Sequence, residues 1–125
     1  VHQMISTITG KLANNTLFSE ILEATFPMGS MTGAPKKRVM ETIDTLEPTR
    51  RGLYSGTVGY FNPDGDFDFN VVIRSIFYNS TTGNASYQVG GGITIYSDPE
   101  KEYEECLLKA AAIKKVLNAD NNTTE

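Results

Sequence analysis

The stretch that decides the fold is Leu53–Tyr78, with the sequence LYSGTVGYFNPDGDFDFNVVIRSIFY. Two runs rich in aromatic and β-branched residues, Leu53–Phe61 and Phe67–Tyr78, flank Asn62–Gly65, whose Asn-Pro-Asp-Gly sequence is typical of a tight turn. Two strands joined by so short a turn pair in antiparallel fashion. The stretch therefore predicts a β-hairpin at the centre of the fold.

Helical patterns lie on both sides of this hairpin. Three helices are expected, from Asn15 or Thr16 to about Thr25, from Pro35 to Pro48, and from Pro99 to about Leu117. The second helix has an apolar stripe that we expect to be buried, formed by Val39, Met40, Ile43 and Leu46. Further strands are expected at Val1–Thr9, Ala85–Val89 and Ile93–Tyr96. Together these elements predict an α+β fold in which an antiparallel sheet packs against helices.

Length and charge limit the classes of function. A chain of 125 residues suits one compact domain, which we place at residues 1–118, followed by a polar tail at residues 119–125. The net charge of −4 argues against nucleic acid as a partner. The sequence has no apolar run long enough for a membrane and no leader pattern, and a single cysteine, Cys106, suits a reducing compartment. We therefore expect a soluble cytoplasmic protein.

The pattern Glu102, Glu105 and Lys109 is the most informative chemical feature of the last predicted helix. Offsets of three, four and seven residues place all three side chains on one stripe. Two carboxylates can hold a divalent cation, and an ammonium group one turn further can hold an anion that the cation also binds. On these three residues alone, however, a solvated helix face is the more common explanation.

Three other features have both a functional and a structural interpretation. Gly90–Gly92 can cradle an anion with backbone N–H groups, or it can be a bulge in a strand. Arg74 follows an apolar run, so we expect it to be buried against an anion, either a substrate carboxylate or a structural acid. Tyr54 lies between Gly52 and Gly56, where its phenol can reach a cleft or simply pack.

Asp64, Asp66 and Asp68 suggest a competing class, a divalent-cation-binding module. Their spacing resembles the start of a calcium loop, but Phe69 stands where such a loop needs glycine and Ser75 where it needs glutamate. An exposed hairpin turn explains them better. His2 is the only histidine, which argues against zinc chemistry and a Ser-His triad.

Several blocks in order give a specific resemblance that covers the chain up to its polar tail. They are FPMGSMTGAPK at residues 26–36, RRGLYSGTVGY at residues 50–60, Ile73–Arg74, Gly90–Ile93 and the Glu102, Glu105, Lys109 stripe. This order resembles the C-terminal part of the chorismate-utilising enzymes, which include aminodeoxychorismate, anthranilate, isochorismate and salicylate synthases. The resemblance implies a larger four-layer αββα domain of which this chain is a fragment.

The resemblance also implies roles for individual residues. Glu105 matches a Mg²⁺ ligand, and Glu102 matches a carboxylate that helps to hold the ion. The positions that match chorismate-binding residues are Ser30, Tyr54, Arg74, Gly90, Gly92 and Lys109. The catalytic histidine of the family falls on Gln3, while His2 is one residue early and should face the other side of a strand.

The sequence of residues 26–36, with Ser30 rather than threonine, resembles that of aminodeoxychorismate synthase more than that of anthranilate synthase. That resemblance implies amination of chorismate to 4-amino-4-deoxychorismate, with ammonia from a glutamine amidotransferase subunit or domain, for p-aminobenzoate and folate synthesis. The second Mg²⁺-binding glutamate of the family, and its segment with a lysine or an equivalent residue, are expected upstream of Val1. The chain alone should therefore hold half of an active site.

Overall fold

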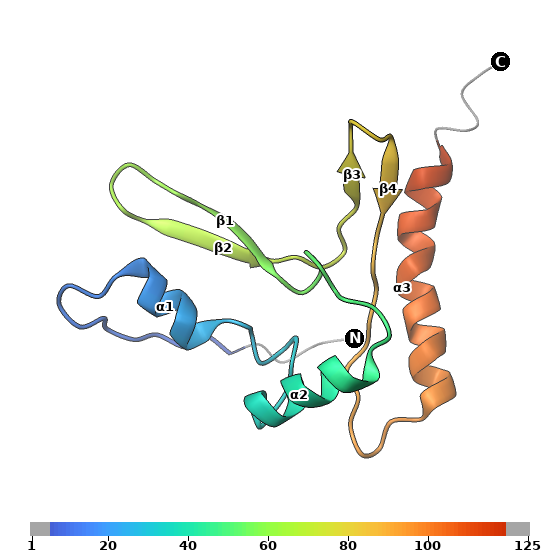
Figure 1. Ribbon diagram of the computed structural model, residues 1–125, viewed down its shortest axis with the longest axis horizontal. Helices are drawn as coiled ribbons and strands as arrows, with labels where there is room; N and C mark the ends of the chain where they lie inside the picture. Colours follow the sequence, from blue (N-terminus) through green and yellow to red (C-terminus); the bar gives the residue numbers. More distant parts are fainter. Residues whose placement is uncertain (1–5, 120–125) are drawn as a thin grey trace. The chain divides into compact units, whose positions relative to one another are not determined.

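The computed structural model describes residues 6–119 (Figure 1). Within these residues seven elements follow one another, namely α1 (Phe18–Thr25), α2 (Lys36–Leu46), β1 (Thr57–Phe61), β2 (Phe67–Val71), β3 (Phe77–Asn79), β4 (Asn84–Ser86) and α3 (Pro99–Ala119). The chain divides into two compact units, Val1–Glu41 and Thr42–Glu125. The mixture of helices with antiparallel strands confirms the predicted α+β class.

The central hairpin forms as predicted. β1 and β2 pair in antiparallel fashion with Thr57 opposite Val71 and Phe61 opposite Phe67. At Gly59 a Cβ would lie 2.5 Å from the ring of Phe69, so only glycine leaves room for that ring. The turn closes through a 2.7 Å hydrogen bond from the Asn62 N–H to the Asp66 carbonyl, and Asp64, Asp66 and Asp68 are exposed, as expected.

The strands beyond the hairpin are shorter than predicted. β2 ends at Val71, and β3 pairs instead with β4 in a second two-stranded sheet. The backbone turns at Arg74, whose φ of 52° interrupts an extended strand. Residues 87–96 and 6–9 form no strand, because no described strand lies beside them to complete a ladder. Val1–Ile5, the rest of the first predicted strand, lie outside the described residues.

Helix α3 begins at Pro99, as predicted. The Asp98 carboxylate accepts a 3.1 Å hydrogen bond from the Lys101 N–H, and proline at the first helical position has no N–H to leave unpaired. The helix continues to Ala119, two residues beyond the predicted end. Its inner stripe supplies Ala110 and Ile113, which with Val72 are the buried apolar residues of the described chain.

The apolar stripe of α2 is not buried, contrary to the prediction. Leu46 is 74% exposed and Met40 40% exposed, while Val39 and Ile43 are half-buried. A helix buries its apolar face only where another element covers it, and no described element makes extensive contact with α2. Periodicity thus predicted the helix correctly but not what covers it.

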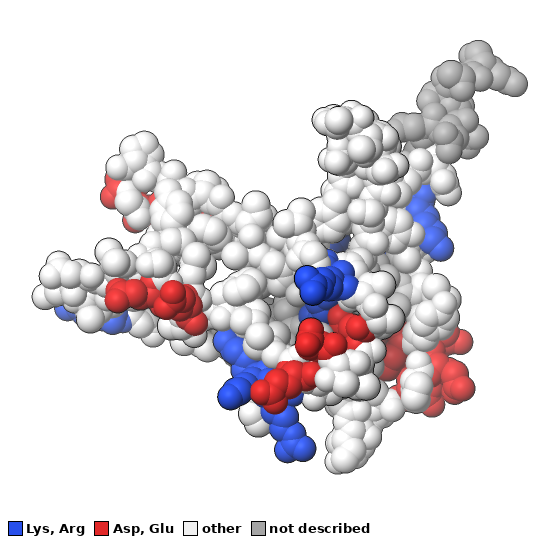
Figure 2. Space-filling model, in the orientation of Figure 1, with Lys and Arg blue, Asp and Glu red and all other residues white. Residues whose placement is uncertain are grey.

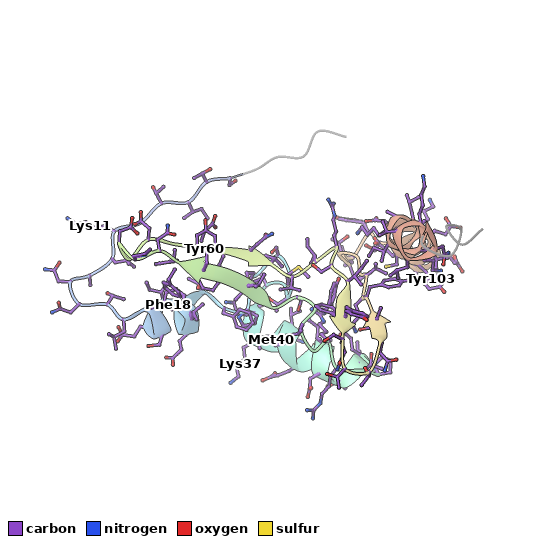
Figure 3. All side chains as sticks on the ribbon, turned by 90° about the horizontal axis from the view of Figure 1, so that it is seen from above. Lys11, Phe18, Lys37, Met40, Tyr60 and Tyr103 are labelled. Atoms are coloured by element: carbon purple, nitrogen blue, oxygen red, sulfur yellow. The ribbon has the colours of Figure 1, made fainter. Side chains whose placement is uncertain are left out.

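Large apolar side chains are exposed elsewhere too, including Tyr60 on β1 and Tyr103 on α3, both labelled in Figure 3. Within residues 6–119, no helix combines the length and apolar character that a membrane span requires.

Candidate active site

The stripe on α3 meets the glycine run through Lys109. The Lys109 Nζ donates a 3.0 Å hydrogen bond to the Gly90 carbonyl and forms a 2.6 Å ion pair with Glu105, one helical turn earlier. Both side chains remain substantially exposed, so this pair contributes only about 0.2–1 kcal/mol to stability. Breaking the ion pair so that either side chain binds a ligand instead therefore requires little free energy.

Glu102 and Tyr54 approach the same glycine run. A Cβ at Gly91 would lie 3.1 Å from the Glu102 Oε2, and one at Gly90 would lie 2.7 Å from the Tyr54 hydroxyl oxygen. Glycine at position 90 is therefore what lets the phenol approach the backbone so closely. The structure thus brings Tyr54, Gly90, Glu102, Glu105 and Lys109 into one place, although they are 55 residues apart in sequence at the extremes.

Tyr54 lies on a turn rather than on a strand, which corrects the predicted element. Its N–H donates a 3.1 Å hydrogen bond to the Arg51 carbonyl, and the Gly56 N–H donates one of 3.0 Å to the Leu53 carbonyl. Ser55 has φ of 63°, a left-handed conformation that is uncommon for a residue other than glycine. We call residues 51–56 the Tyr54 turn. Its backbone conformation sets the direction of the phenol.

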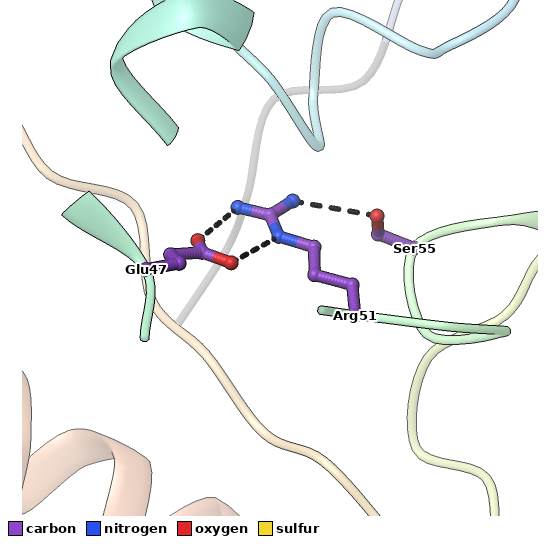
Figure 4. Close-up of polar contacts among 3 residues, drawn as sticks. All are labelled: Glu47, Arg51 and Ser55. Atoms are coloured by element: carbon purple, nitrogen blue, oxygen red, sulfur yellow. Dashed lines mark hydrogen bonds and ion pairs between the residues drawn. The ribbon is translucent and has the colours of Figure 1, made fainter. Parts of the chain in front are cut away.

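A polar network at this turn was missed by the sequence analysis. The Arg51 guanidinium donates two hydrogen bonds to the Glu47 carboxylate, with lengths of 2.8 and 2.5 Å, and one of 3.3 Å to the Ser55 hydroxyl (Figure 4). These bonds lower the pKa of Glu47, and they raise the pKa of Arg51 still further above neutrality. The spacing of four residues was a usable signal, but Pro48 ends the helical pattern between them.

Four predicted residues are not placed in this cluster. Arg74 is exposed at the bend after β2, not buried as expected, and no hydrogen bond or ion pair among residues 6–119 joins it to the α3 stripe. Gly92 is exposed, with open space where a Cβ would be. Ser30 is exposed in the other compact unit, and Gln3, like His2, lies outside the described residues.

Comparisons with known proteins identify the family of the chain. The family model of the chorismate binding enzymes matches residues 1–115. The chain belongs to the chorismate binding enzyme family.

Relatives of this family member carry two kinds of name. The chain is 50% identical over 117 residues to a probable chloroplastic aminodeoxychorismate synthase of Oryza sativa subsp. japonica. The aligned segment covers 94% of the chain and 13% of that protein. The chain is 43% identical over all its residues to aminodeoxychorismate synthase component 1 of Bacillus subtilis, covering 26% of that protein. It is also 41% identical over 122 residues to anthranilate synthase component 1 of Synechocystis, covering 95% of the chain and 24% of that protein. The chain therefore spans about a quarter or less of these relatives.

The carboxylates near the start of α3 were predicted to hold a metal ion. Figure 2 shows acidic side chains gathered over the start of α3, where the sequence has Glu100, Glu102, Glu104 and Glu105. Within the described residues, no group of three or more His, Cys, Asp or Glu side chains could hold a metal ion, and Asp64, Asp66 and Asp68 are no exception. Of the two carboxylates predicted to hold the ion, Glu102 lies beside Gly91 and Glu105 pairs with Lys109. A sparse oxygen donor set of this kind fits Mg²⁺, which keeps most of its waters.

Proposed function

We propose that the chain forms part of the chorismate site of an aminodeoxychorismate synthase, which converts chorismate and ammonia to 4-amino-4-deoxychorismate. Relatives that carry this name and are 43–50% identical support the proposal. The name "component 1" of the Bacillus subtilis relative implies a second component, which we propose is a glutamine amidotransferase that delivers ammonia. In this role the protein would act in the cytoplasm, in p-aminobenzoate and folate synthesis.

The arrangement around Gly90 suits a substrate with two carboxylates. The Lys109 ammonium group and the Tyr54 hydroxyl both reach Gly90, one by a hydrogen bond to its carbonyl and the other by close approach. A chorismate carboxylate placed between them would accept a charge-assisted hydrogen bond from Lys109 and a second hydrogen bond from the phenol. In this reading the loop amides around Gly92 complete the cradle, while Arg74 contacts the rest of the substrate. Gln3 takes the position of the family's catalytic histidine.

Glu102 and Glu105 on α3 are the residues that would hold Mg²⁺, which would supply positive charge to stabilise the oxygen that leaves the ring. Glu105 would then bind the ion instead of the Lys109 ammonium group, and that ammonium group could pair with a substrate carboxylate. The exposed ion pair makes this exchange inexpensive, since such pairs contribute about 0.2–1 kcal/mol.

Anthranilate synthase is the second candidate. Relatives of that name from Synechocystis and from Arthrobacter globiformis are 41% and 43% identical to the chain. The two reactions share chorismate and differ in the product. The residues that we place at Gly90 would serve either reaction equally, because they bind the shared substrate.

The product distinguishes the candidates. The complete protein in which this chain occurs, called here the complete enzyme, would be incubated with chorismate, Mg²⁺ and ammonium, and the products separated by chromatography. Formation of 4-amino-4-deoxychorismate is expected. Anthranilate would establish the second candidate, and recovery of unchanged chorismate, with active Bacillus subtilis component 1 as the control, would refute both.

A further inference from the structure

The turn that carries Tyr54 is strained and needs an external restraint. Ser55 adopts a left-handed backbone that costs about 1 kcal/mol or more for a residue with a Cβ. Two backbone hydrogen bonds of 3.0 Å join the turn to Val72, from the Ser55 N–H to the Val72 carbonyl and from the Val72 N–H to the Gly56 carbonyl. These bonds fix one side of the turn at a buried residue. They do not reach the other side, where the chain arrives from α2.

Arg51 restrains that other side. Its planar guanidinium binds Glu47, just beyond the last residue of α2, through two nitrogens, and a third bond reaches the Ser55 hydroxyl across the turn (Figure 4). Glu47 is itself anchored by a 2.9 Å hydrogen bond from its N–H to the Ile43 carbonyl, within α2. The guanidinium therefore spans from the end of the helix to the strained residue. A lysine would not reproduce the two-nitrogen pairing with Glu47 together with the bond to Ser55, because it lacks the planar fork.

We propose that Arg51 is a positioning residue, which holds Glu47 and Ser55 together so that the turn presents the Tyr54 hydroxyl to Gly90. The proposal rests on the proposed function for its kinetic consequences, but not for its structural ones. Arg51 touches no reacting atom in this reading and acts only through Tyr54. Restraint of the turn before binding keeps the phenol in place without a cost when the substrate arrives.

The kinetic test is a double-mutant cycle in the complete enzyme. Tyr54→Phe should raise the KM for chorismate about tenfold or more, as expected for a lost hydrogen bond to a charged group. Arg51→Lys should raise the KM about threefold to tenfold, with kcat changed less. In the Tyr54→Phe background, Arg51→Lys should add less than twofold. Independent effects that multiply in the double variant would overturn the proposal, because Arg51 would then act by another route.

Two further variants separate positioning from general stability. Ser55→Ala removes only the hydroxyl, leaves the Glu47 pair intact and keeps the same backbone cost at position 55, and it should raise the KM as Arg51→Lys does. An unchanged KM in Ser55→Ala would refute positioning of the turn through Ser55. Arg50→Lys is the matched control, since Arg50 is an exposed neighbour outside this network, and it should leave the KM unchanged.

A second readout does not depend on chorismate. The tyrosines of the complete enzyme, six of which lie in this chain, would be labelled as 3-fluorotyrosine, and the ¹⁹F resonance of Tyr54 would be assigned from its loss in Tyr54→Phe. Arg51→Lys should shift or broaden that resonance, while those of Tyr60, Tyr78 and Tyr103 stay in place. An unchanged Tyr54 resonance would refute the positioning role. Inactivity of the unsubstituted enzyme toward chorismate would instead refute the proposed function and leave this spectroscopic test to decide the inference.

Discussion

Gly90→Ala is the sharpest test of the geometry around Tyr54. The new Cβ would lie 2.7 Å from the phenol oxygen, whereas ordinary contact begins at about 3.4 Å, so the hydroxyl must retreat by about 0.7 Å. The backbone should tolerate alanine, because the φ of Gly90 is not in the left-handed region. The substitution should therefore move the phenol rather than unfold the turn.

The expected magnitude follows from the bond that is lost. A hydrogen bond to a charged group contributes about 1.5–3 kcal/mol, which corresponds to about a tenfold to hundredfold change in affinity. Isothermal titration calorimetry of chorismate binding to the complete enzyme, in Mg²⁺ and without ammonium, measures the loss directly. Gly10→Ala is the control, because a Cβ there meets nothing within 4 Å and Gly10 lies outside the site.

The same substitution should have little effect once the phenol oxygen is gone. In the Tyr54→Phe background, the nearest ring carbon lies 3.7 Å from the new Cβ, which is ordinary contact. We therefore expect Gly90→Ala to weaken binding tenfold or more with tyrosine at position 54 and less than twofold in that background. Equal losses in both backgrounds would refute the argument that the hydroxyl acts at Gly90.

Four further predictions concern the charged residues and the isolated chain. Glu105→Gln should abolish most activity of the complete enzyme by removing a Mg²⁺ ligand, and undiminished activity would contradict this. The 125-residue chain alone should show no turnover of chorismate, and measurable product would contradict this. Arg74→Ala should weaken chorismate binding by only about 1 kcal/mol, roughly fivefold, since the side chain is exposed, and an unchanged KM would exclude Arg74 from the site. Glu47→Gln should lower the free energy of unfolding by about 0.2–1 kcal/mol at pH 7. Because the folded-state pKa of Glu47 is depressed below its ordinary value of 4.5, the difference in Tm between the two proteins should vanish as the pH falls through that depressed pKa. A difference in Tm that persists in acid would contradict the ion pair.

The sequence predicted local structure better than long-range structure. The Asn62–Gly65 turn and the start of α3 at Pro99 are encoded within a few residues, and both form where expected. The burial of the α2 stripe and of Arg74 was predicted wrongly, because burial depends on what covers a side chain rather than on its own spacing. The prediction of a continuous strand across Arg74 was wrong for a similar reason, since an apolar run does not show where the backbone turns.

The candidate site shows the same division. Helical spacing alone placed Glu105 and Lys109 together, and their ion pair follows from the offset of four. Nothing local predicted that Lys109 would reach Gly90, or that Tyr54 would also approach it. Those contacts join separate segments, so the resemblance of whole blocks to a family carried information that single-segment patterns could not.

Near the candidate site, hydrogen bonds to individual side chains contribute more to rigidity than burial does. Val72, Ala110 and Ile113 are the buried apolar residues of residues 6–119, so packing provides little rigidity near the site. Directional bonds act instead, from Lys109 to the Gly90 carbonyl and from Arg51 to Ser55. Such bonds hold a direction even where the surrounding surface is exposed, whereas apolar contact is non-directional. Substitutions that remove a single donor should therefore alter substrate binding more than those that trim an exposed apolar side chain.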